Sequence, residues 1–243
     1  MSKQWQAFYQ TEAKCYNAQR YHSWYGALFA RLHHNFLREV MSGCAKDASI
    51  LDLACGTGHN LAVLLDYGRL VVACDLTSAM VQEAIKQYKG EKLVYTLGNA
   101  LQLPFPDNTF DVVASSRFLH LFPESQQQLC VREMNRILKP GGLLIVDFYN
   151  RYQWLFLSPF IALYRAIKCK RPTEDTLNTI FKVKRWMAKQ DLTMKRAIGV
   201  GSYFLILARF LPDDSVFRLG RLFGRPPFRI LSEQFIVVAQ KRL

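Results

Sequence analysis

Short apolar runs alternate with amphipathic segments along the first 150 residues, and this alternation constrains the fold more than any other feature. Segments that suit buried strands lie at 49–53, 70–74, 92–97, 111–115 and 143–148. Between them, apolar residues recur at helical spacing over 59–67, 78–88 and 125–138. Strands that alternate with helices in this way form β-α-β units, which build a mostly parallel sheet covered by helices on both faces. We therefore expect an α/β fold.

The regions on either side of this alternation have a different character. In residues 1–45, aromatic and aliphatic side chains recur at three- and four-residue steps, which indicates helix. Beyond residue 150 we expect helices near 152–168, 176–190 and 203–223, and strands near 193–200 and 234–240. We divide the chain into an N-terminal helical part (1–45), a core (46–150 and 230–243), and a basic, aromatic elaboration that includes one core strand (151–229).

Composition narrows the class of protein. Half of the residues are hydrophobic and 21% are charged, so the chain can bury a core and is neither disordered nor a disulfide-stapled miniprotein. Its six cysteines form no C-x-x-C pair, which argues against a zinc ribbon or redox motif and suits a reducing compartment. The chain opens without a secretory signal, and no apolar window is long enough to span a bilayer. These features predict a cytoplasmic protein.

The segment Ile50–Gly58 reads ILDLACGTG and carries the clearest functional signal. A predicted strand ends there, Gly56 and Gly58 permit a tight turn with close backbone approach, and a helix is expected to begin. This arrangement would present backbone N–H groups and a positive helix end to a ligand. Position 61 is Leu where a dinucleotide-binding fingerprint has its third glycine, which disfavours a nicotinamide oxidoreductase. Asp52 adds a carboxylate that suits a positively charged ligand better than a pyrophosphate.

Two further polar positions follow the next predicted strands. Asp75 ends the second strand, where an acidic side chain can accept hydrogen bonds from both hydroxyls of a ribose. A loop that contains Asn99 follows the third strand and offers an amide and backbone N–H groups to the edge of a base. Each alone is compatible with an ordinary strand end or turn. Their order and spacing together predict a nucleoside-binding crevice.

These segments resemble the class I S-adenosylmethionine-dependent methyltransferases, most closely the branch of the ubiquinone and menaquinone C-methyltransferases. The matching stretches are LDLACGTG, VVACDLTSAMVQEA, GNALQLPFPDNTFDVV and REMNRILKPGGLLIVDF, which cover roughly 48–150. The resemblance implies a seven-stranded Rossmann-like sheet, with six strands parallel and the last antiparallel, and S-adenosylmethionine at the carboxyl ends of the first and fourth strands. It also implies that the N-terminal helical part forms a lid over this donor.

The resemblance assigns donor-binding roles by position. The methionine part would be surrounded by Asp52, Ala54, Gly56 and Gly58 with Ser115 or Ser116, the ribose would be held by Asp75, and the adenine would contact Leu76, Asn99 and Ala100. Two positions depart from the family's pattern, which often has Gly at 54 and Asp at 99. Ala54 is a mild change, and Asn99 keeps an oxygen acceptor for the adenine amino group without the charge.

The motifs give less information about the residues that bind the methyl acceptor than about those that bind the donor. Candidate acceptor-binding residues are Tyr16, Tyr21, Arg117 and Tyr149. His120 follows the fourth strand, where the family places groups that face the acceptor, and it is the candidate general base. An alternative interpretation, at least as good for the tyrosines, is that they lie on a helix face packed against the sheet. His120 could likewise be a histidine that is only packed. His59 is expected beside the donor, His22, His33 and His34 are expected on the helix surface, and we expect no metal site.

Positive charge is concentrated in residues 151–229, which carry 16 Lys and Arg against 5 Asp and Glu and so hold most of the net charge of +13. Within this region, 152–170 and 203–229 combine aromatic and aliphatic residues with Arg and Lys, as interfacial helices do. An alternative interpretation is a cap over the acceptor whose charges are solvated.

Together these features favour methyl transfer to a small acceptor that is lipophilic or anionic, such as a quinone precursor or a lipid. The enzyme would be cytoplasmic, with contact to the inner face of an anionic membrane as one interpretation of its charge. An RNA methyltransferase is the main alternative, although RNA-binding surfaces mix basic residues with glycine and polar residues rather than with Leu, Ile and Phe. A donor-binding adaptor without catalysis is the other, and the retained glycines and aspartates weigh against it.

Overall fold

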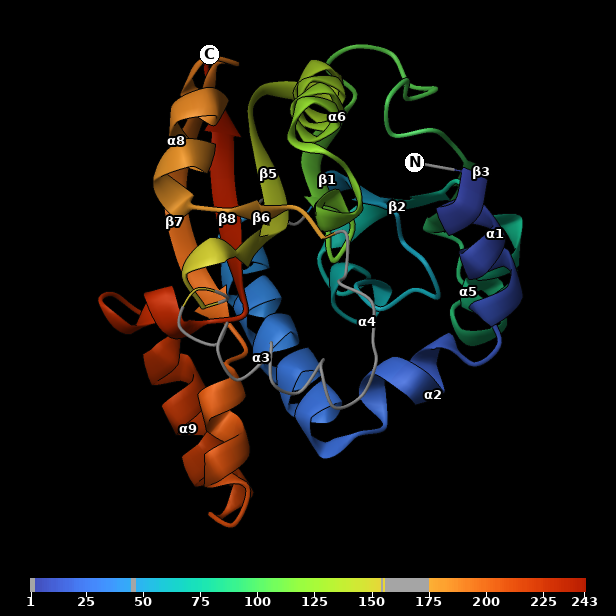
Figure 1. Cartoon of the computed structure of the whole chain (residues 1–243). Helices are drawn as coiled ribbons and strands as arrows, with labels where there is room; N and C mark the ends of the chain where they lie inside the picture. The colour runs from blue at the N-terminus through green and yellow to red at the C-terminus, as the bar shows by residue number, and fades with distance from the viewer. Residues whose placement is uncertain (1–2, 45–46, 154, 156–174) are drawn as a thin grey trace.

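One mixed sheet organises the computed structural model, which describes residues 3–44, 47–153, 155 and 175–243. The strand order is β3-β2-β1-β4-β5-β8-β7, with β6 paired to β5 (Figure 1). The strands are β1 (Ala48–Leu53), β2 (Gly68–Asp75), β3 (Leu93–Leu97), β4 (Phe110–Ser115), β5 (Leu138–Asn150), β6 (Leu177–Asn178), β7 (Leu192–Val200) and β8 (Gln234–Lys241).

The directions of the strands confirm the predicted topology. Strands β1 to β5 are parallel to their neighbours, and β8 is antiparallel to both β5 and β7, so that β7 runs in the direction of β5. The sheet therefore has six parallel strands and a last strand that is antiparallel. The two-residue strand β6, parallel to β5, is an addition that the sequence did not indicate.

Helices cover both faces of this sheet (Figure 1). The α-helices are α1 (Lys3–Glu12), α2 (Tyr16–Tyr21), α3 (Trp24–Met41), α4 (Leu61–Leu64), α5 (Ser78–Gln87), α6 (Glu124–Ile137), α8 (Ile180–Ala188) and α9 (Asp213–Phe223). Successive side chains of a strand point to opposite faces, which is visible in β1. Leu51 and Leu53 join one hydrophobic cluster with α6 and α8, whereas Ile50 joins a second cluster with α3, α4 and α9.

Several expected helices differ from the structure. The helix expected over 59–67 is only Leu61–Leu64, because turns occupy residues 56–60. The positive helix end expected at the glycine turn thus belongs to a helix of four residues that begins at Leu61. The helix expected over 203–223 is divided into the 3₁₀ helix Tyr203–Ala208 and α9, with Pro212 at the start of α9. Most of the helix expected over 152–168 lies outside the described residues.

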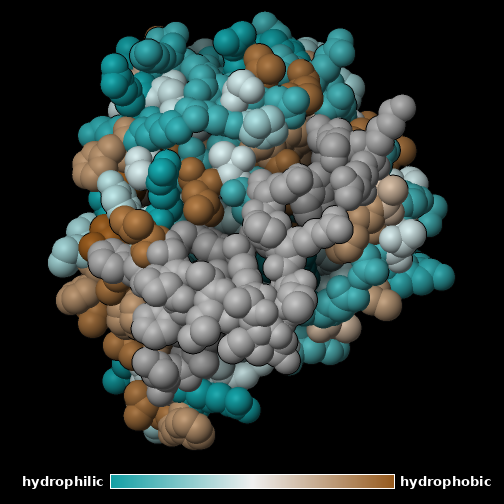
Figure 2. Space-filling model, in the orientation of Figure 1, coloured by the Kyte–Doolittle hydropathy of each residue, from teal (hydrophilic) through white to brown (hydrophobic). Residues whose placement is uncertain are grey.

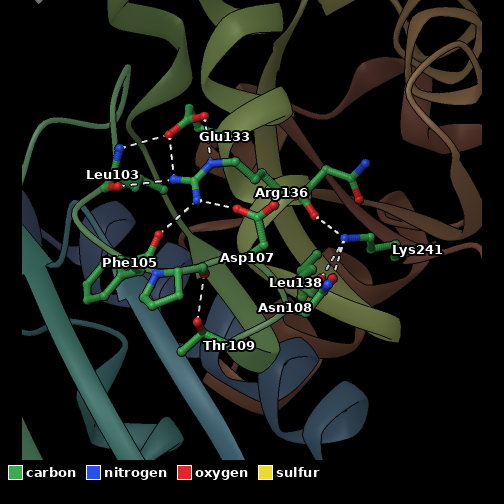
Figure 3. A network of polar contacts seen from close by, with 11 residues as sticks. Leu103, Phe105, Asp107, Asn108, Thr109, Glu133, Arg136, Leu138 and Lys241 are labelled. Atoms are coloured by element: carbon green, nitrogen blue, oxygen red, sulfur yellow. Dashed lines mark hydrogen bonds and ion pairs between the residues drawn. The ribbon is translucent and has the colours of Figure 1, made fainter.

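A polar network fixes the long loop between β3 and β4 to α6 (Figure 3). The guanidinium of Arg136 donates to Glu133 at 2.9 and 3.0 Å and to Asp107 at 2.8 Å. It also donates to the carbonyl oxygens of Leu103 and Phe105, at 3.1 and 2.8 Å. One side chain thus holds three points of the loop, at Leu103, Phe105 and Asp107, to α6.

Among the residues that the structure describes, no helix combines the length and the apolar character needed to cross a bilayer.

Candidate active site

A pocket of about 860 Å³ opens at the carboxyl ends of β1, β2 and β4. Open parallel sheets bind ligands at this edge, where the strand order reverses. Ten of the residues expected at the site line it, namely Ala54, Gly56, Asp75, Leu76, Asn99, Ala100, Ser116, Arg117, Tyr16 and Tyr21. The position of these residues agrees with the expectation, while their roles toward a ligand stay predictions.

The turn after β1 exposes its backbone to the pocket. Ala54, Gly56 and Gly58 all have left-handed backbone conformations, with φ values of 55°, 54° and 91°. A Cβ atom on Gly58 would lie 2.8 Å from the ring of Tyr88, so only glycine fits there, whereas a Cβ on Gly56 would meet nothing within 4 Å. Gly58 therefore serves packing behind the pocket, and Gly56 leaves open space for a ligand.

Asp75 holds this turn from the end of β2. Its carboxylate accepts hydrogen bonds from the backbone N–H of Gly56 at 2.9 Å and of Thr77 at 2.8 Å. Burial raises the pKa of Asp75, and these two N–H groups act in the opposite direction because they stabilise the charged form. The carboxylate oxygens retain further acceptor capacity, so Asp75 can bind a hydroxyl in the pocket while it holds the loop.

Asp52 lies behind the turn instead of lining the pocket. It is fully buried, and its Oδ1 accepts a hydrogen bond from the side-chain amide of Asn60 at 2.8 Å. Its Oδ2 has no hydrogen-bond partner among the described residues. Burial raises the pKa of Asp52 to about 7, the bond from Asn60 lowers it, and the nearby charge of Asp75 raises it further. Asn60 itself lines the pocket, so it connects Asp52 to the site.

The loop after β3 forms another wall of the pocket. The N–H of Gly98 donates to the carbonyl oxygen of Asp75 at 3.0 Å, and a Cβ on Gly98 would lie 2.6 Å from Sγ of Cys74. Oδ1 of Asn99 accepts a hydrogen bond from the N–H of Leu101 at 3.1 Å. An amide oxygen has a second lone pair, so Asn99 can close this turn and still accept a hydrogen bond from a base.

Aromatic side chains and Arg117 form another part of the pocket lining among the described residues. Arg117 has a φ of 56°, and its backbone N–H contacts both carboxylate oxygens of the buried Asp147 at 2.9 Å. Its guanidinium lies 5.6 Å from the ring centres of Tyr21 and Phe29, within the range of cation–π attraction. Burial raises the pKa of Tyr21 to about 12, so this hydroxyl keeps its proton at physiological pH.

Five expected site residues do not line the pocket in the described part of the chain. Besides Asp52 and Gly58, these are Ser115, His120 and Tyr149. Ser115 is buried with its Oγ unpartnered among the described residues, so of the two serines only Ser116 reaches the pocket. The rings of His120 and Tyr149 pack together with centroids 4.2 Å apart, and Nε2 of His120 lies 3.9 Å from Asp175. Burial lowers the pKa of His120 to about 3.

Other residues at the site were missed or misplaced by the sequence. The expectation that His33 lies on a helix surface is wrong, because it is buried with Nε2 at 3.0 Å from Oγ of Ser116. The spacing of Phe29, His33 and Phe36 along α3 carried the signal, since such positions share one face of a helix. His59 lines the pocket as expected.

Comparisons with known proteins agree with this geometry. The family model described as "Methyltransferase domain" matches residues 51–146. The chain is 38% identical over 122 residues to the demethylmenaquinone methyltransferase of Beutenbergia cavernae, an alignment that covers 50% of this chain and 48% of that protein. The chain thus spans about half the length of several curated relatives that it matches.

A longer alignment and a solved structure extend the likeness. An uncharacterized methyltransferase of Synechocystis sp. is 30% identical over 161 residues, which cover 66% of this chain and 74% of that protein. The fold resembles magnesium protoporphyrin IX methyltransferase of Synechocystis PCC 6803, solved with bound S-adenosylhomocysteine, with a TM-score of 0.64, 14% identity, and coverage of 90% and 88% of the two chains. The chain therefore belongs to the methyltransferase family.

Proposed function

We propose that this protein transfers the methyl group of S-adenosylmethionine to a small acceptor that is lipophilic or anionic. The observation that carries the proposal is one pocket whose lining combines two kinds of residue: loops at the strand ends with the carboxylate of Asp75, and the side chains of Tyr9, Phe118, Phe122 and Arg117. In the proposal the first group, the donor end, holds a nucleoside with a positively charged tail. The second group, the aromatic end, suits a flat or apolar acceptor with a negative oxygen.

Three features of the donor end fit S-adenosylmethionine. Gly56 leaves its backbone open to a ligand, Asp75 presents acceptor oxygens, and Asp52 has a buried oxygen without a partner in the described structure. In the proposal Asp75 accepts hydrogen bonds from the ribose hydroxyls, while Asn99 contacts the adenine edge. Ser116 contacts the methionine end, and Asp52 stabilises its amino group through Asn60 or bound water.

The chemistry demands alignment more than acid catalysis. A bound sulfonium donor supplies an electrophilic methyl group and leaves as an uncharged thioether, so its departure needs no proton. The protein must hold the acceptor atom in line with that methyl group. Arg117 remains protonated at any physiological pH and can stabilise an acceptor oxygen that carries negative charge, and Tyr21 can donate a hydrogen bond to it.

His120 stays the candidate for taking a proton from the acceptor. Burial keeps its ring neutral, so it has a lone pair to accept a proton. A pKa of about 3 makes it a weak base, and its position against Tyr149 places it beside the aromatic end instead of in the pocket wall. We therefore expect a modest contribution from His120, at the lower end of what general bases supply.

The names of several relatives support a quinone precursor as the acceptor. The chain is 38% identical to the Beutenbergia cavernae demethylmenaquinone methyltransferase and, over 115 residues, to a ubiquinone/menaquinone biosynthesis C-methyltransferase of Hahella chejuensis. Both matches cover under half of those proteins. Quinone precursors with isoprenoid tails are flat and lipophilic, which agrees with the aromatic end of the pocket.

A lipophilic acceptor suggests contact with a bilayer, and α9 and the loop before it offer the chemistry for it. Phe210 is 94% exposed, Leu211 and Leu222 are about half exposed, and Arg209 and Arg221 lie beside them in the sequence. Figure 2 shows hydrophobic side chains at the lower end of the molecule, over the region that α9 occupies in Figure 1. In the proposal this surface docks on an anionic bilayer, where each basic residue contributes about 1 kcal/mol.

Sedimentation with vesicles tests this docking. The protein should sediment with phosphatidylglycerol vesicles and much less with phosphatidylcholine vesicles, and Phe210→Asp should weaken the association. Equal behaviour on both vesicle types would contradict an anionic bilayer as the partner of this surface.

The methyl acceptor can be identified with isotope-labelled S-adenosylmethionine. The protein is incubated with the donor and either a cell lipid extract or total RNA, and the products are analysed by mass spectrometry. We expect label in a quinone precursor or a lipid. Label in RNA instead would replace the proposed acceptor, and binding of the donor without label in any fraction would favour a non-catalytic adaptor.

A further inference from the structure

Three histidines from two separate segments meet beside the pocket. His33 and His34 are consecutive on α3, and His59 lies in the turn that follows Gly58. One ring nitrogen of each histidine lies within 4.8 Å of those of the other two. The ring centres of His34 and His59 are 4.2 Å apart, and Tyr21 stacks on His59 at 4.3 Å. The packing of α3 against the glycine turn thus gathers three imidazoles in one place.

Two nitrogens of this cluster lack partners. Nδ1 of His33 and Nε2 of His59 are buried and have no hydrogen-bond partner among the described residues. His33 is only 3% exposed. Folded proteins rarely leave buried polar atoms unpaired, and such atoms are commonly satisfied by a bound water or ion. Two of them lie in this one cluster, and a bound ion would satisfy both.

The rings are in the protonation state that a metal ion needs. Burial lowers the pKa of His33 to about 3 and that of His59 to about 2, so both rings are neutral at physiological pH. Oγ of Ser116 lies 3.0 Å from Nε2 of His33. The other ring nitrogen, Nδ1, is the one without a partner among the described residues. A hydrogen bond at this position fixes the orientation of metal-binding histidines in many sites.

The ligand type selects the class of ion. Imidazole nitrogens suit Zn²⁺, Co²⁺, Ni²⁺ and Cu²⁺, whereas Mg²⁺ and Ca²⁺ prefer oxygen ligands. We propose that His33, His34 and His59 bind one divalent transition-metal ion of the Zn²⁺ type at the edge of the pocket. Zinc–nitrogen distances of about 2.0–2.1 Å bring tetrahedral ligand nitrogens to about 3.4 Å from one another. The rings therefore close by roughly 1 Å when the ion binds.

The ion would join α3 to the glycine turn. His34 already contacts this turn through Nε2, which lies 2.9 Å from the carbonyl oxygen of His59. His59 and Ser116 both line the pocket, so the ion and a ligand in the pocket share two supporting residues. If the ion changes the affinity of the pocket for that ligand, the ligand changes the affinity for the ion by the same factor. The metal site itself does not depend on the proposed methyl transfer.

Cobalt provides a direct readout, because bound Co²⁺ absorbs visible light according to its ligands. Full-length protein without a purification tag is freed of metal with a chelator and titrated with CoCl₂. We expect one equivalent of saturable visible absorption, displaced by one equivalent of Zn²⁺, and a higher Tm in the presence of Zn²⁺. His34→Gln and His59→Gln should each lose the saturable absorption, and His120→Gln, which removes a buried histidine elsewhere, should keep it.

The choice of variants keeps the test decisive. His34 is partly exposed, so His34→Gln should fold even if a variant of the more buried His59 does not, and circular dichroism checks both. The proposal is overturned if the unmodified protein gives no saturable Co²⁺ absorption. It is equally overturned if folded His34→Gln binds Co²⁺ as tightly as the unmodified protein, or if His120→Gln loses the signal as well.

Discussion

The two ends of the pocket are built in different ways. At the donor end, the contacts are made by loops that directly follow strands, and the partners lie within 20 positions of one another: Asp75 binds the N–H groups of Gly56 and Thr77. Near Arg117, but outside the pocket lining, partners come from segments far apart. The hydroxyl of Tyr25 in α3 donates to Glu233 at 2.8 Å, a contact between residues 208 positions apart.

This difference explains which end a sequence motif can reveal. Backbone turns between strands are specified by local glycines and acidic residues, so the donor end leaves a compact signature in the chain. The aromatic end needs the whole fold to be assembled before its side chains meet, and its composition is that of any packed helix face. A family can therefore keep one end recognisable while the other end varies with the acceptor.

The largest effect that separates the two ends is expected from Asp75→Ala. The substitution removes the proposed acceptor of two hydrogen bonds from the ribose. Hydrogen bonds to a charged group are each worth about 1.5–3 kcal/mol, so the affinity for S-adenosylhomocysteine should fall by about 100-fold or more. Isothermal titration calorimetry measures this. Asp66→Ala, at an exposed position after α4, is the matched control and should bind normally; equal affinity of the two variants would remove Asp75 from the donor site.

A substitution at the aromatic end should leave donor binding intact. His120→Gln removes the candidate proton acceptor, and kcat should fall by about 100-fold, the lower end of the range for general bases. The Kd of S-adenosylhomocysteine should not change. His22→Gln at an exposed position serves as the control. A normal kcat over the full pH range would show that His120 only packs against Tyr149.

Asp52, at the donor end, should make the free energy of unfolding depend on pH. Its pKa of about 7 lies above the ordinary value of 3.8, so the folded state binds a proton that the unfolded state releases. The contribution of Asp52 to the free energy of unfolding should therefore be largest below pH 4. It should decrease as the pH rises to 7, by at most about 1.4 kcal/mol per pH unit. Asp52→Asn should flatten this dependence in urea titrations at several pH values. An unchanged slope would mean that Asp52 is ionised in the folded protein throughout.

The long-range contact near Arg117 is tested by Tyr25→Phe. Loss of a hydrogen bond to the carboxyl group of Glu233 should lower the free energy of unfolding by about 1.5 kcal/mol. Urea denaturation measures the change, with Tyr67→Phe as the control at another partly buried tyrosine. Equal effects of both substitutions would show that the Tyr25 hydroxyl does not hold α3 to the end of the chain.

The smallest effect concerns the glycine turn. Ala54 has a φ of 55°, a conformation that glycine adopts without steric cost. Ala54→Gly should therefore raise the free energy of unfolding by about 0.5–1 kcal/mol without weakening donor binding. Ala62→Gly, in the short helix α4, is the opposite control and should lower it. A destabilised Ala54→Gly protein would contradict the strain inferred at this turn.

The sequence predicts most of the fold because its strands carry local signals. The seven main strands and the antiparallel β8 follow from apolar runs and the family resemblance, whereas the strand order comes from the structure. Ten expected residues line the pocket. Asp52 is buried and does not line the pocket, and its role beside the donor stays a prediction. His33 shares one face of α3 with Phe29 and Phe36, which indicated burial but not that Ser116 would be its neighbour.

The central claim is that the crevice at the carboxyl ends of β1, β2 and β4 holds the methyl donor by its sugar. A crystal structure of the protein soaked with S-adenosylhomocysteine tests this most directly. We predict that both ribose hydroxyls lie within hydrogen-bond distance of the Asp75 carboxylate, with the adenine against Leu76 and beside Asn99. A nucleoside bound elsewhere, or a crevice that stays empty at saturating ligand, would contradict the account.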